Sequence, residues 1–369
     1  MIKQISINNY KSFFNETNIL FENLNIITGE NSSGKSSILE TLIILKQKNE
    51  TDFLNGHLKT IGDKKYLINN QNNNKRVTFG YETSNGNIEL EFNLENSRVL
   101  EDNTINFDII YLSAERVGVK DLYEKKIIHE NFDPTGNTLV TLLEKEKNNT
   151  KIGTHLAKKI NMDLKAKPDF TLYKYESEYL ERDDDTFYGK VTFLDFLNYW
   201  MDKFTGYKVE IEQIERTNFI QLRYKKADKI YTPMQVGTGV TFVLFQLIAT
   251  CLSKDNSVIL VENPEIHLHP KMQSHLMYFY LWCSQINKQI IIETHSDHIF
   301  NACRYFKVVG EKCKIYFLEN KLLIIEEEEV YATLINDIEV DEYGDLINEH
   351  ENLFDQYIID IRKMLGTTI

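Results

Sequence analysis

Cysteine is scarce in this sequence, with four residues in a chain of 369 and no C-x-x-C pair. A disulfide framework or a cysteine-based metal site needs paired or closely spaced cysteines, so this pattern argues against both. Each cysteine lies in an apolar stretch that is typical of a helix or strand. We therefore expect four buried free thiols, Cys251, Cys283, Cys303 and Cys313, and a reducing compartment.

The sequence also lacks a long uninterrupted hydrophobic run. The longest apolar segment, Val240–Leu252, is broken by Thr241, Gln246 and Thr250. The N-terminal residues MIKQISINNYKSF place no cationic stretch before an apolar one, so they lack the pattern of a secretory leader. We expect a cytoplasmic protein without membrane contact.

Basic residues are in the minority. The chain has 42 Lys and Arg against 55 Asp and Glu, a formal net charge of −13. A negative surface repels nucleic acid, which argues against tight DNA binding by the whole surface and favours a protein partner. A local basic groove stays possible, but its candidates are dilute: Lys158, Lys159, Lys165, Lys167, Lys225 and Lys226.

A hydrophobic content of 42%, with 12% aromatic residues, can form a large core in two or three lobes. Residues 1–117 are mostly strand-like. A predicted hairpin and a short apolar strand lead through a glycine-containing loop into a helix, and further strands follow. The predicted strands are Ile2–Ile7, Asn18–Phe21, Leu24–Thr28, Arg76–Tyr81, Asn87–Leu94 and Phe107–Leu112, and the helix is Ser36–Lys46.

The middle of the chain has a different character. Residues 118–206 are charged and mainly helical, with the better helix patterns at Thr138–Lys145 and Val191–Phe204. The stretch Glu176–Asp185 is typical of a solvated acidic segment. We interpret this part as an inserted helical lobe, without a motif that we can name.

The last third begins with a predicted hairpin and then alternates helix with strand. Such alternation predicts a parallel sheet with flanking helices in residues 207–318, and residues 319–369 predict a small closing element. The hairpin is Tyr207–Glu215 with Phe219–Tyr224, the helices are Val240–Leu252, Pro270–Ser284 and Asp297–Tyr305, and the strands are Val258–Glu262, Gln289–Thr294 and Lys314–Leu318.

The strongest chemical signal is GENSSGKS at Gly29–Ser36, which matches the G-x-x-x-x-G-K-[ST] pattern in full. Between a strand and a helix, this loop turns its backbone N–H groups and the helix N-terminus toward phosphates. Lys35 is expected to neutralise the β- and γ-phosphates, and Ser36 to bind Mg²⁺. A flexible glycine and serine turn is the alternative. The predicted nucleotide-binding residues are Gly29, Glu30, Asn31, Ser32, Ser33, Gly34, Lys35, Ser36 and Ser37.

A second signal is Val258–Glu262, an apolar strand that ends in a carboxylate. Open α/β sheets bind ligands at the carboxyl edge of their strands, so this acid would lie beside the nucleotide. Glu262 is therefore a candidate to hold Mg²⁺, directly or through water. By itself, an apolar strand that ends in Glu is structural about as often as it is functional. Its occurrence together with the phosphate-binding loop favours the functional interpretation.

A third signal is His295, which follows the apolar strand residues Ile290-Ile-Ile-Glu-Thr. An imidazole at this edge could reach the γ-phosphate and report its presence. A lone histidine is more often structural or solvated. The position one strand beyond Glu262 favours the functional interpretation.

Taken in order, INNYKSF, LNIITGENSSGKSSILETL, VENPEIHLHP and IIIETHSDHI resemble motifs of the AAA-family ATPases of ABC/SMC type, akin to recombination ATPases and the ATPase half of OLD-family nucleases. The resemblance implies an α/β fold, a P-loop NTPase of ABC-ATPase type with a mixed sheet, flanking helices, N-terminal antiparallel strands and an inserted helical lobe. It also implies ATP hydrolysis with ATP and Mg²⁺ as cofactors, in a head-to-tail homodimer that encloses the nucleotide.

The family completes its site with a signature segment from the partner subunit, and Val236–Thr241 looks like its counterpart. The expected nucleotide contacts are Gly237, Gly239 and Thr241. Glycines permit close approach, and a helix that begins near Val240 would aim its N-terminus at the γ-phosphate. The alternative is a turn with an N-cap before a buried helix.

One position departs from the family pattern. ABC-type enzymes usually have Asp-Glu where this chain has Glu262 and Asn263, and Asn263 can orient water but cannot accept a proton. Glu265 could accept the proton if the turn at Pro264 points its side chain inward. Because Asn263 replaces the second acid, slow catalysis is expected. The candidate catalytic residues are Glu262, Asn263, Glu265 and His295.

The run His267–Pro270 lies where the family has its inter-subunit loop. Two histidines that flank one residue could suggest a metal site. Because the sequence positions no third ligand for His267 and His269, we prefer an interface role.

The tail differs from that of OLD-family nucleases, which continue into a magnesium-dependent TOPRIM module. About 75 residues follow His295, and the acidic run Glu326–Glu329 lacks a glycine turn that would present a carboxylate to a metal. We expect no nuclease in this chain, and a solvated strand end at the acidic run.

These features lead to a preferred function and two alternatives. We expect a homodimeric ATPase whose nucleotide state gates a partner protein, by analogy an effector nuclease in an anti-phage system. The first alternative is a DNA-repair or chromosome-associated ATPase that clamps nucleic acid. The second is a nucleotide-dependent scaffold with slow turnover.

Overall fold

The computed structural model describes residues 1–127, 132–166, 191–325, 327–348 and 350–365. The chain forms two compact units, each built from ranges that are not contiguous in sequence. The first unit comprises Met1–Ile109, Asn256–Glu265 and Asn287–Ile369, and the second comprises Ile110–Asp255 and Ile266–Ile286. The four-part division into residues 1–117, 118–206, 207–318 and 319–369 stays a prediction.

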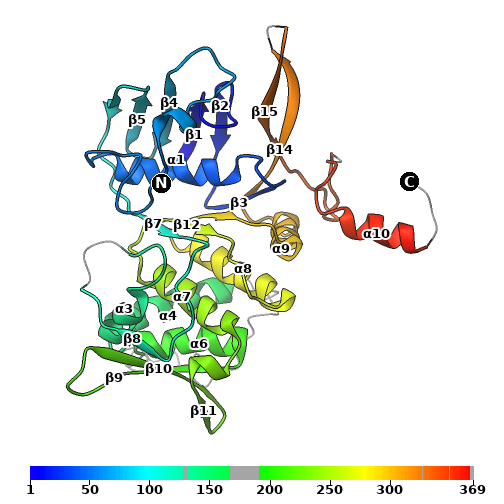
Figure 1. Cartoon of the computed structure of the whole chain (residues 1–369). Helices are drawn as coiled ribbons and strands as arrows, with labels where there is room; N and C mark the ends of the chain where they lie inside the picture. The colour runs from blue at the N-terminus through cyan, green and yellow to red at the C-terminus, as the bar shows by residue number, and fades with distance from the viewer. Residues whose placement is uncertain (128–131, 167–190, 326, 349, 366–369) are drawn as a thin grey trace. The chain divides into compact units, whose positions relative to one another are not determined.

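An antiparallel sheet begins the first unit, with the strand order β2-β1-β4-β5-β6 (Figure 1). Ile5 and Ile7 alternate with more exposed residues, so one face of the sheet packs on the core. The predicted N-terminal hairpin is confirmed, because Gln4 pairs with Leu20 in an antiparallel register. The strands are β1 (Ile2–Asn8), β2 (Thr17–Leu20), β4 (Val77–Thr83), β5 (Gly86–Phe92) and the unpredicted β6 (Ser97–Asp102).

The second sheet of this unit runs in the order β15-β14-β3-β13-β12. The strands β14, β3, β13 and β12 are mutually parallel, and β15 pairs antiparallel with β14, which makes the sheet mixed as predicted. Every residue of β12 and β13 is buried, as expected for strands covered on both faces. The strands are β3 (Leu24–Gly29), β12 (Val258–Glu262), β13 (Gln289–Glu293), β14 (Cys313–Ile325) and β15 (Glu328–Asp337), and β7 (Ile109–Leu112) begins where the first range of the unit ends.

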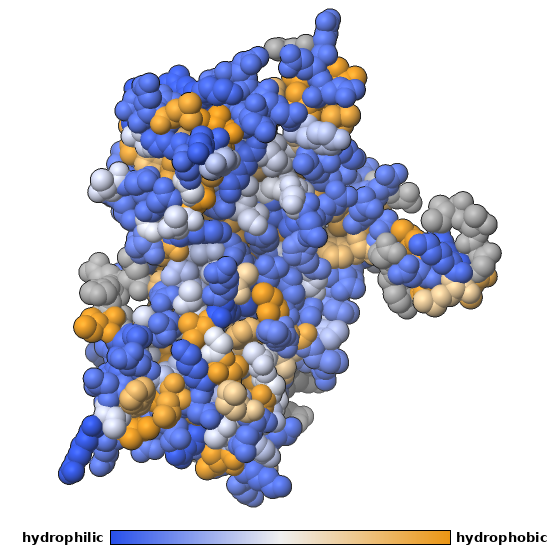
Figure 2. All heavy atoms as spheres, in the orientation of Figure 1, coloured by the Kyte–Doolittle hydropathy of each residue, from blue (hydrophilic) through white to orange (hydrophobic). Residues whose placement is uncertain are grey.

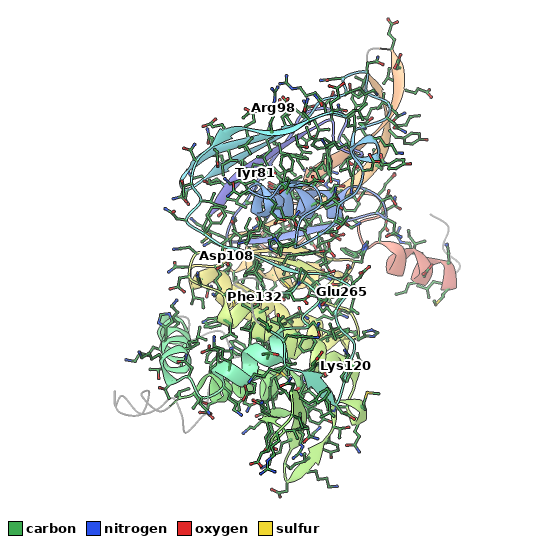
Figure 3. The ribbon with its side chains drawn as sticks, turned by 60° about the vertical axis from the view of Figure 1, so that its left-hand side comes forward. Tyr81, Arg98, Asp108, Lys120, Phe132 and Glu265 are labelled. Atoms are coloured by element: carbon green, nitrogen blue, oxygen red, sulfur yellow. The ribbon has the colours of Figure 1, made fainter. Side chains whose placement is uncertain are left out.

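The helix α1 lies between the two sheets of the first unit (Figures 1 and 3). It packs against β3 and β13, and the hydroxyl of Tyr81 on β4 donates to the carbonyl oxygen of Thr41 at 2.7 Å. Another helix, α9, packs against β3 and β14. The helices of this unit are α1 (Lys35–Gln47), α2 (Lys64–Leu67), α9 (Asp297–Val308) and α10 (Gln356–Met364).

The second unit combines a small antiparallel sheet with helices. Its strands run in the order β11-β10-β8, and β9 also pairs with β10, which confirms the predicted hairpin. The strands are β8 (Leu122–Glu124), β9 (Lys208–Gln213), β10 (Phe219–Lys226) and β11 (Lys229–Tyr231). The helices are α3 (Leu139–Glu146), α4 (Thr150–Ala166), α6 (Phe193–Thr205), α7 (Thr238–Leu252), α8 (Pro270–Gln285) and the 3₁₀ turn η2 (Pro233–Gln235).

Aromatic residues of α6 and α8 pack together in the core of the second unit. The ring of Trp200 lies 5.2 Å from that of Phe279 and 5.6 Å from that of Trp282, measured between centroids. Gln246, a polar residue within the apolar segment of α7, accepts a hydrogen bond from the Tyr280 hydroxyl at 2.7 Å. The polar side chain of Gln246 is therefore satisfied inside the core.

Hydrophilic residues cover most of the face shown in Figure 2. Within the part of the chain that the structure describes, no helix is long and apolar enough to cross a membrane. The prediction of buried free thiols is confirmed for Cys251, Cys283, Cys303 and Cys313.

The dilute basic residues have separate surroundings. Lys159 donates to Asp255 at 3.0 Å, and Lys226 lies 5.1 Å above the ring of Tyr207. Lys158 and Lys225 are exposed. Lys167 and the acidic stretch Glu176–Asp185 lie outside the described residues, as does the side chain of Lys165. A basic groove formed by these lysines stays a hypothesis.

Candidate nucleotide-binding site

The predicted phosphate-binding loop connects β3 to α1, as the sequence pattern requires. Gly29 has φ of +145°, and a Cβ atom on it would lie 2.1 Å from the carbonyl oxygen of Leu318 on β14. Gly34 has φ of +101°, and its added Cβ would lie 2.8 Å from Thr333 Oγ1 of β15. Both positions thus need glycine for backbone conformation and for space.

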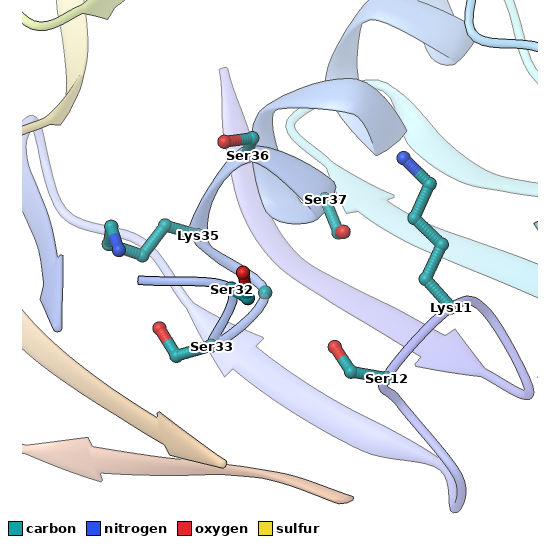
Figure 4. A pocket seen from close by; sticks show the side chains of 8 residues that line it. Lys11, Ser12, Ser32, Ser33, Lys35, Ser36 and Ser37 are labelled. Carbon is teal, nitrogen blue, oxygen red and sulfur yellow. The ribbon is translucent and has the colours of Figure 1, made fainter. Parts of the chain in front are cut away.

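A pocket of about 290 Å³ lies over this loop (Figure 4). Its lining combines the start of α1 with Lys11 and Ser12 of the N-terminal segment NNYKSF. The first N–H groups of an α-helix have no partner inside the helix, and they attract anions. The pocket is lined by Lys11, Ser12, Ser32, Ser33, Gly34, Lys35, Ser36 and Ser37.

Lys35 lies across the loop rather than out in solvent. Its ammonium group donates to the carbonyl oxygens of Gly29 at 3.1 Å and of Glu30 at 2.5 Å. Burial lowers the pKa of Lys35, and the negative charges of Glu293 and Glu30 oppose that shift. The loop therefore holds a cation whose present partners are neutral carbonyl groups.

The other predicted loop residues divide into buried and exposed ones. Ser33 and Ser37 are buried, whereas Asn31 and Ser32 are exposed. The carboxylate of Glu30 accepts a hydrogen bond from Asn352 Nδ2 at 2.7 Å, so the C-terminal segment reaches the loop.

Two carboxylates from adjacent strands lie at the start of α1. Glu262 of β12 and Glu293 of β13 are register partners at the carboxyl edge of the sheet. The Ser36 hydroxyl donates to Glu293 Oε1 at 2.8 Å, and the Lys59 ammonium lies 3.2 Å from Glu262 Oε1. The structure thus brings the predicted residues Ser36 and Glu262 together with Glu293, which the sequence motifs did not single out.

Burial raises the pKa of Glu293 to about 7. The hydrogen bond from Ser36 opposes this shift, the neighbouring charge of Glu262 adds to it, and Lys35 and Lys59 oppose it. A sequence signal for Glu293 exists, because β13 is an apolar strand that ends in a carboxylate, just as β12 is. The same pattern that predicted Glu262 therefore also applies to Glu293, two residues before His295.

A network of charges connects the acidic edge to the pocket. Glu40 on α1 is buried and accepts from the hydroxyl of Tyr10 at 2.7 Å and from Lys11 at 2.5 Å. Lys59 lies 3.9 Å from the same carboxylate and also pairs with Glu262. Lys11 and Lys59 are thus two cations near the loop, and neither is among the predicted site residues, although Lys11 lies in the motif NNYKSF.

The predicted residues Asn263, Glu265 and His295 come together in the first unit. Glu265 Oε1 accepts the backbone N–H of His295 at 2.8 Å and lies 3.4 Å from Asn263 Nδ2. Burial and the charge of Lys35 lower the pKa of His295, and Glu265 opposes that shift. Figure 3 labels Glu265 at this edge.

The predicted signature residues lie at the start of α7 in the second unit. Gly237 and Thr238 are exposed, and Gly239 packs so closely that an added Cβ would lie 2.4 Å from the carbonyl oxygen of His267. Thr241 is fully buried, and its hydroxyl lies 2.8 Å from the Tyr224 hydroxyl. In this arrangement Thr241 faces the core, and the exposed hydroxyl at the helix start is that of Thr238.

The two histidines of the HLHP run have local contacts. His269 caps α8 by accepting the backbone N–H of Lys271 at 3.3 Å, and the ring of His267 lies 5.3 Å from that of Phe242. The described part of the chain contains no group of three or more His, Cys, Asp or Glu side chains that could hold a metal ion. These findings leave the interface role as the prediction for His267 and His269.

Comparisons with known proteins agree with this geometry. A profile of the family described as "AAA domain, putative AbiEii toxin, Type IV TA system" matches residues 24–301, more than half of the chain. A search of curated proteins finds no match. Among solved structures, the SMC head bound to the C-winged helix domain of ScpA is similar in fold, with a TM-score of 0.50 and 11% identity over 91% of this chain and 97% of that chain.

Two further SMC heads give similar matches. The head domain from Thermotoga maritima has a TM-score of 0.49 and 11% identity, over 92% of this chain and 99% of that one. The head domain from Pyrococcus furiosus, bound to the C-terminal domain of ScpA, has a TM-score of 0.49 and 10% identity over 99% of each chain.

Proposed function

Since this chain belongs to the AbiEii-type family of AAA ATPases, with the ABC/SMC-like fold, we propose that it binds ATP with Mg²⁺ at the loop Gly29–Ser36 and hydrolyses it. The helix N-terminus and Lys35 bind the phosphates. Ser36 and Glu262 hold the magnesium ion, which neutralises phosphate charge when bound.

The observation that carries the proposal is the arrangement around Ser36. Its hydroxyl, one residue after the loop lysine, donates to Glu293 at 2.8 Å, and Glu262 is the register partner of Glu293 on the adjacent parallel strand. Hydroxyl and carboxylate oxygens are the ligands that Mg²⁺ prefers, and the buried Glu293 Oε2 has no hydrogen-bond partner among the described residues. The donor set therefore fits a magnesium ion.

Lys35→Ala tests this function directly. Loss of the ammonium leaves the phosphate charge without its cation, so ATP affinity should fall at least tenfold, since a hydrogen bond to a charged group contributes about 1.5–3 kcal/mol. Isothermal titration calorimetry measures the affinity. Lys312→Ala, at an exposed lysine, is the matched control. Equal affinity of the Lys35 and Lys312 variants would remove the basis for the proposed site.

For hydrolysis we propose that Glu265 accepts the proton of the attacking water and that Asn263 orients it. Glu265 Oε1 is held by the His295 N–H, and its buried Oε2 lacks a hydrogen-bond partner in the described part of the chain. His295 reports the γ-phosphate from the same strand edge. The pair Glu262-Asn263 at the end of β12 contains one acid where ABC-type enzymes have two adjacent acids. This difference is consistent with slow turnover.

At the level of assembly we propose a head-to-tail homodimer that encloses ATP and gates a partner protein in the cytoplasm. The partner would be an effector nuclease of an anti-phage system. The family description names a toxin of a toxin–antitoxin system, which supports control of a second protein. The net charge of −13 favours this function over a nucleic-acid clamp, and Asn263 keeps the slow-turnover scaffold as the second candidate.

A further inference from the structure

Glu293 is part of the polar surroundings of the proposed magnesium site and touches Ser36, but the proposed function assigns the holding of the ion to Ser36 and Glu262. Its side chain is 4% exposed, and one carboxylate oxygen accepts the Ser36 hydroxyl at 2.8 Å. Within the described residues, the other oxygen, Oε2, is buried and has no hydrogen-bond partner. A buried acceptor without a partner is unfavourable, so its presence beside a binding site points to a ligand group.

We propose that Glu293 is a positioning residue for magnesium: it accepts a hydrogen bond from the Ser36 hydroxyl so that Ser36 Oγ presents a lone pair to the ion, and its Oε2 accepts from water held by the ion. The proposal rests on the proposed nucleotide site. It adds to that site a residue on a different strand from Glu262.

The chemistry of the serine hydroxyl supports this role. A hydroxyl has one donor and two acceptor lone pairs, and its rotation is otherwise free. When Glu293 Oε1 accepts the hydrogen bond from Ser36, both lone pairs of the hydroxyl are directed away from the carboxylate. Partners behind the direct ligands orient them in this way at many metal sites, and their loss typically weakens metal affinity about 10–100-fold.

The charges around Glu293 also favour a role beside a magnesium ion. Glu262 and Glu293 occupy the same register position on neighbouring strands, so their like charges repel each other. Lys59 is bonded to Glu262 at 3.2 Å, whereas the Ser36 hydroxyl donates to Glu293. A divalent cation held at Ser36 would offset the charge of both carboxylates. Magnesium keeps several of its waters when it binds proteins, and these waters are donors for Glu293 Oε2.

The test compares magnesium dependence in Glu293→Gln and wild type. Gln has nearly the same size and keeps an acceptor for Ser36, but it removes the negative charge. We expect ADP affinity in EDTA to be retained, while the apparent affinity for Mg²⁺ of the ADP complex, from calorimetry at a series of Mg²⁺ concentrations, falls about tenfold or more. The control is Glu91→Gln, which removes another buried carboxylate of the same unit, held by Arg76 and Arg98.

A double-mutant cycle shows whether Glu293 acts through Ser36. In a Ser36→Ala background, Glu293→Asp should change magnesium affinity by less than about twofold, because Asp keeps the charge and the hydroxyl that Glu293 orients is gone. If the Gln variant does not fold, Glu293→Asp keeps the charge and withdraws the carboxylate from Ser36. It should also weaken magnesium affinity.

The possible outcomes separate this inference from the proposed function. Wild-type magnesium affinity in Glu293→Gln or in Glu293→Asp would overturn the inference, and so would full additivity with Ser36→Ala. Both results leave nucleotide binding intact. Failure of the wild-type protein to bind ADP even with Mg²⁺ would instead overturn the proposed function, and this inference with it.

Discussion

Glu293 is costly to bury as an anion, and the fold compensates only part of that cost. The Ser36 hydroxyl serves one of its oxygens, and burial still raises its pKa to about 7. Its protonated form is therefore favoured in the folded chain relative to the unfolded one, where a carboxyl titrates near its ordinary value.

This shift predicts a pH dependence of stability in the absence of metal. Between about pH 4.5 and pH 7 the folded state binds more protons at Glu293 than the unfolded state, so the free energy of unfolding falls as pH rises through that window. Glu293→Gln removes this pH-dependent contribution to the free energy of unfolding, because Gln does not titrate. Urea unfolding in EDTA at pH 5 and pH 8 should therefore show Glu293→Gln gaining stability relative to wild type at the higher pH. A constant difference between the two proteins would refute the shift.

Gly29 tests the fit of the loop against its neighbouring strand. Gly29→Ala combines a φ of +145° with a Cβ at 2.1 Å from a backbone oxygen, so either the loop or β14 must move. We expect a loss of about 3 kcal/mol or more in the free energy of unfolding, since backbone strain and overpacking each cost about 1–3 kcal/mol. Gly62→Ala is the matched control, with φ of +132° and no described atom within 4 Å of its Cβ. Equal losses would show that the contact with Leu318 is unimportant.

At the scale of elements, β15 supports the loop from the edge of the sheet. Thr333 Oγ1 lies 2.9 Å from the carbonyl oxygen of Ser33 and 2.7 Å from Ser12 Oγ. The Thr333 hydroxyl thus lies within hydrogen-bond distance of both the loop backbone and the N-terminal segment. One residue of an edge strand joins two parts of the pocket lining.

Thr333→Val keeps the shape of this side chain and removes both hydrogen bonds. The buried carbonyl of Ser33 then loses a donor, so stability should fall by about 1–3 kcal/mol and nucleotide affinity should fall with it as the loop loosens. Thr333→Ser, which keeps the hydroxyl, should retain affinity. Thermal unfolding and calorimetry measure the two effects. A Val variant that binds nucleotide as well as the Ser variant would exclude a role of β15 in shaping the loop.

At the scale of the whole molecule, the exposed start of α7 allows a test of assembly. Gly237 has φ of −62°, which suits any residue, and no described atom lies within 4 Å of an added Cβ. Gly237→Arg should therefore leave folding and ATP binding of one subunit intact, but block closure of a head-to-tail dimer and abolish hydrolysis. Gly239 is unsuitable, because its side chain would meet the backbone of His267 within the same subunit.

Mixing Gly237→Arg with Lys35→Ala subunits completes this prediction. A head-to-tail dimer of the two variants combines both lesions in one site and leaves the other site intact, so part of the ATPase activity should return. Phosphate release measures it, with confirmed mixed dimers and each variant alone as controls. Normal hydrolysis by Gly237→Arg alone would contradict the proposed signature, and inactive mixed dimers would contradict independent sites.

Local sequence patterns were sufficient to predict many of the helices, strands and binding-site residues of this protein. The loop GENSSGKS, its flanking strand and helix, and the alternation of the last third were all predictable, because phosphate binding uses the backbone of consecutive residues. The same reasoning found the acidic strand end at Glu262, and also His295, which follows the end of β13. Each of these signals lies within one short segment.

The tertiary structure decided the contacts between distant segments. Ser36 and Glu293 are 257 positions apart, and Thr333 and Ser33 are 300 apart. Periodicity predicts whether a segment is buried, but not which strand lies beside it, because strand order and register depend on packing of the whole sheet. For the same reason the sequence did not show that Thr241, which follows the signature glycines, faces the core, where its hydroxyl lies 2.8 Å from that of Tyr224 on β10.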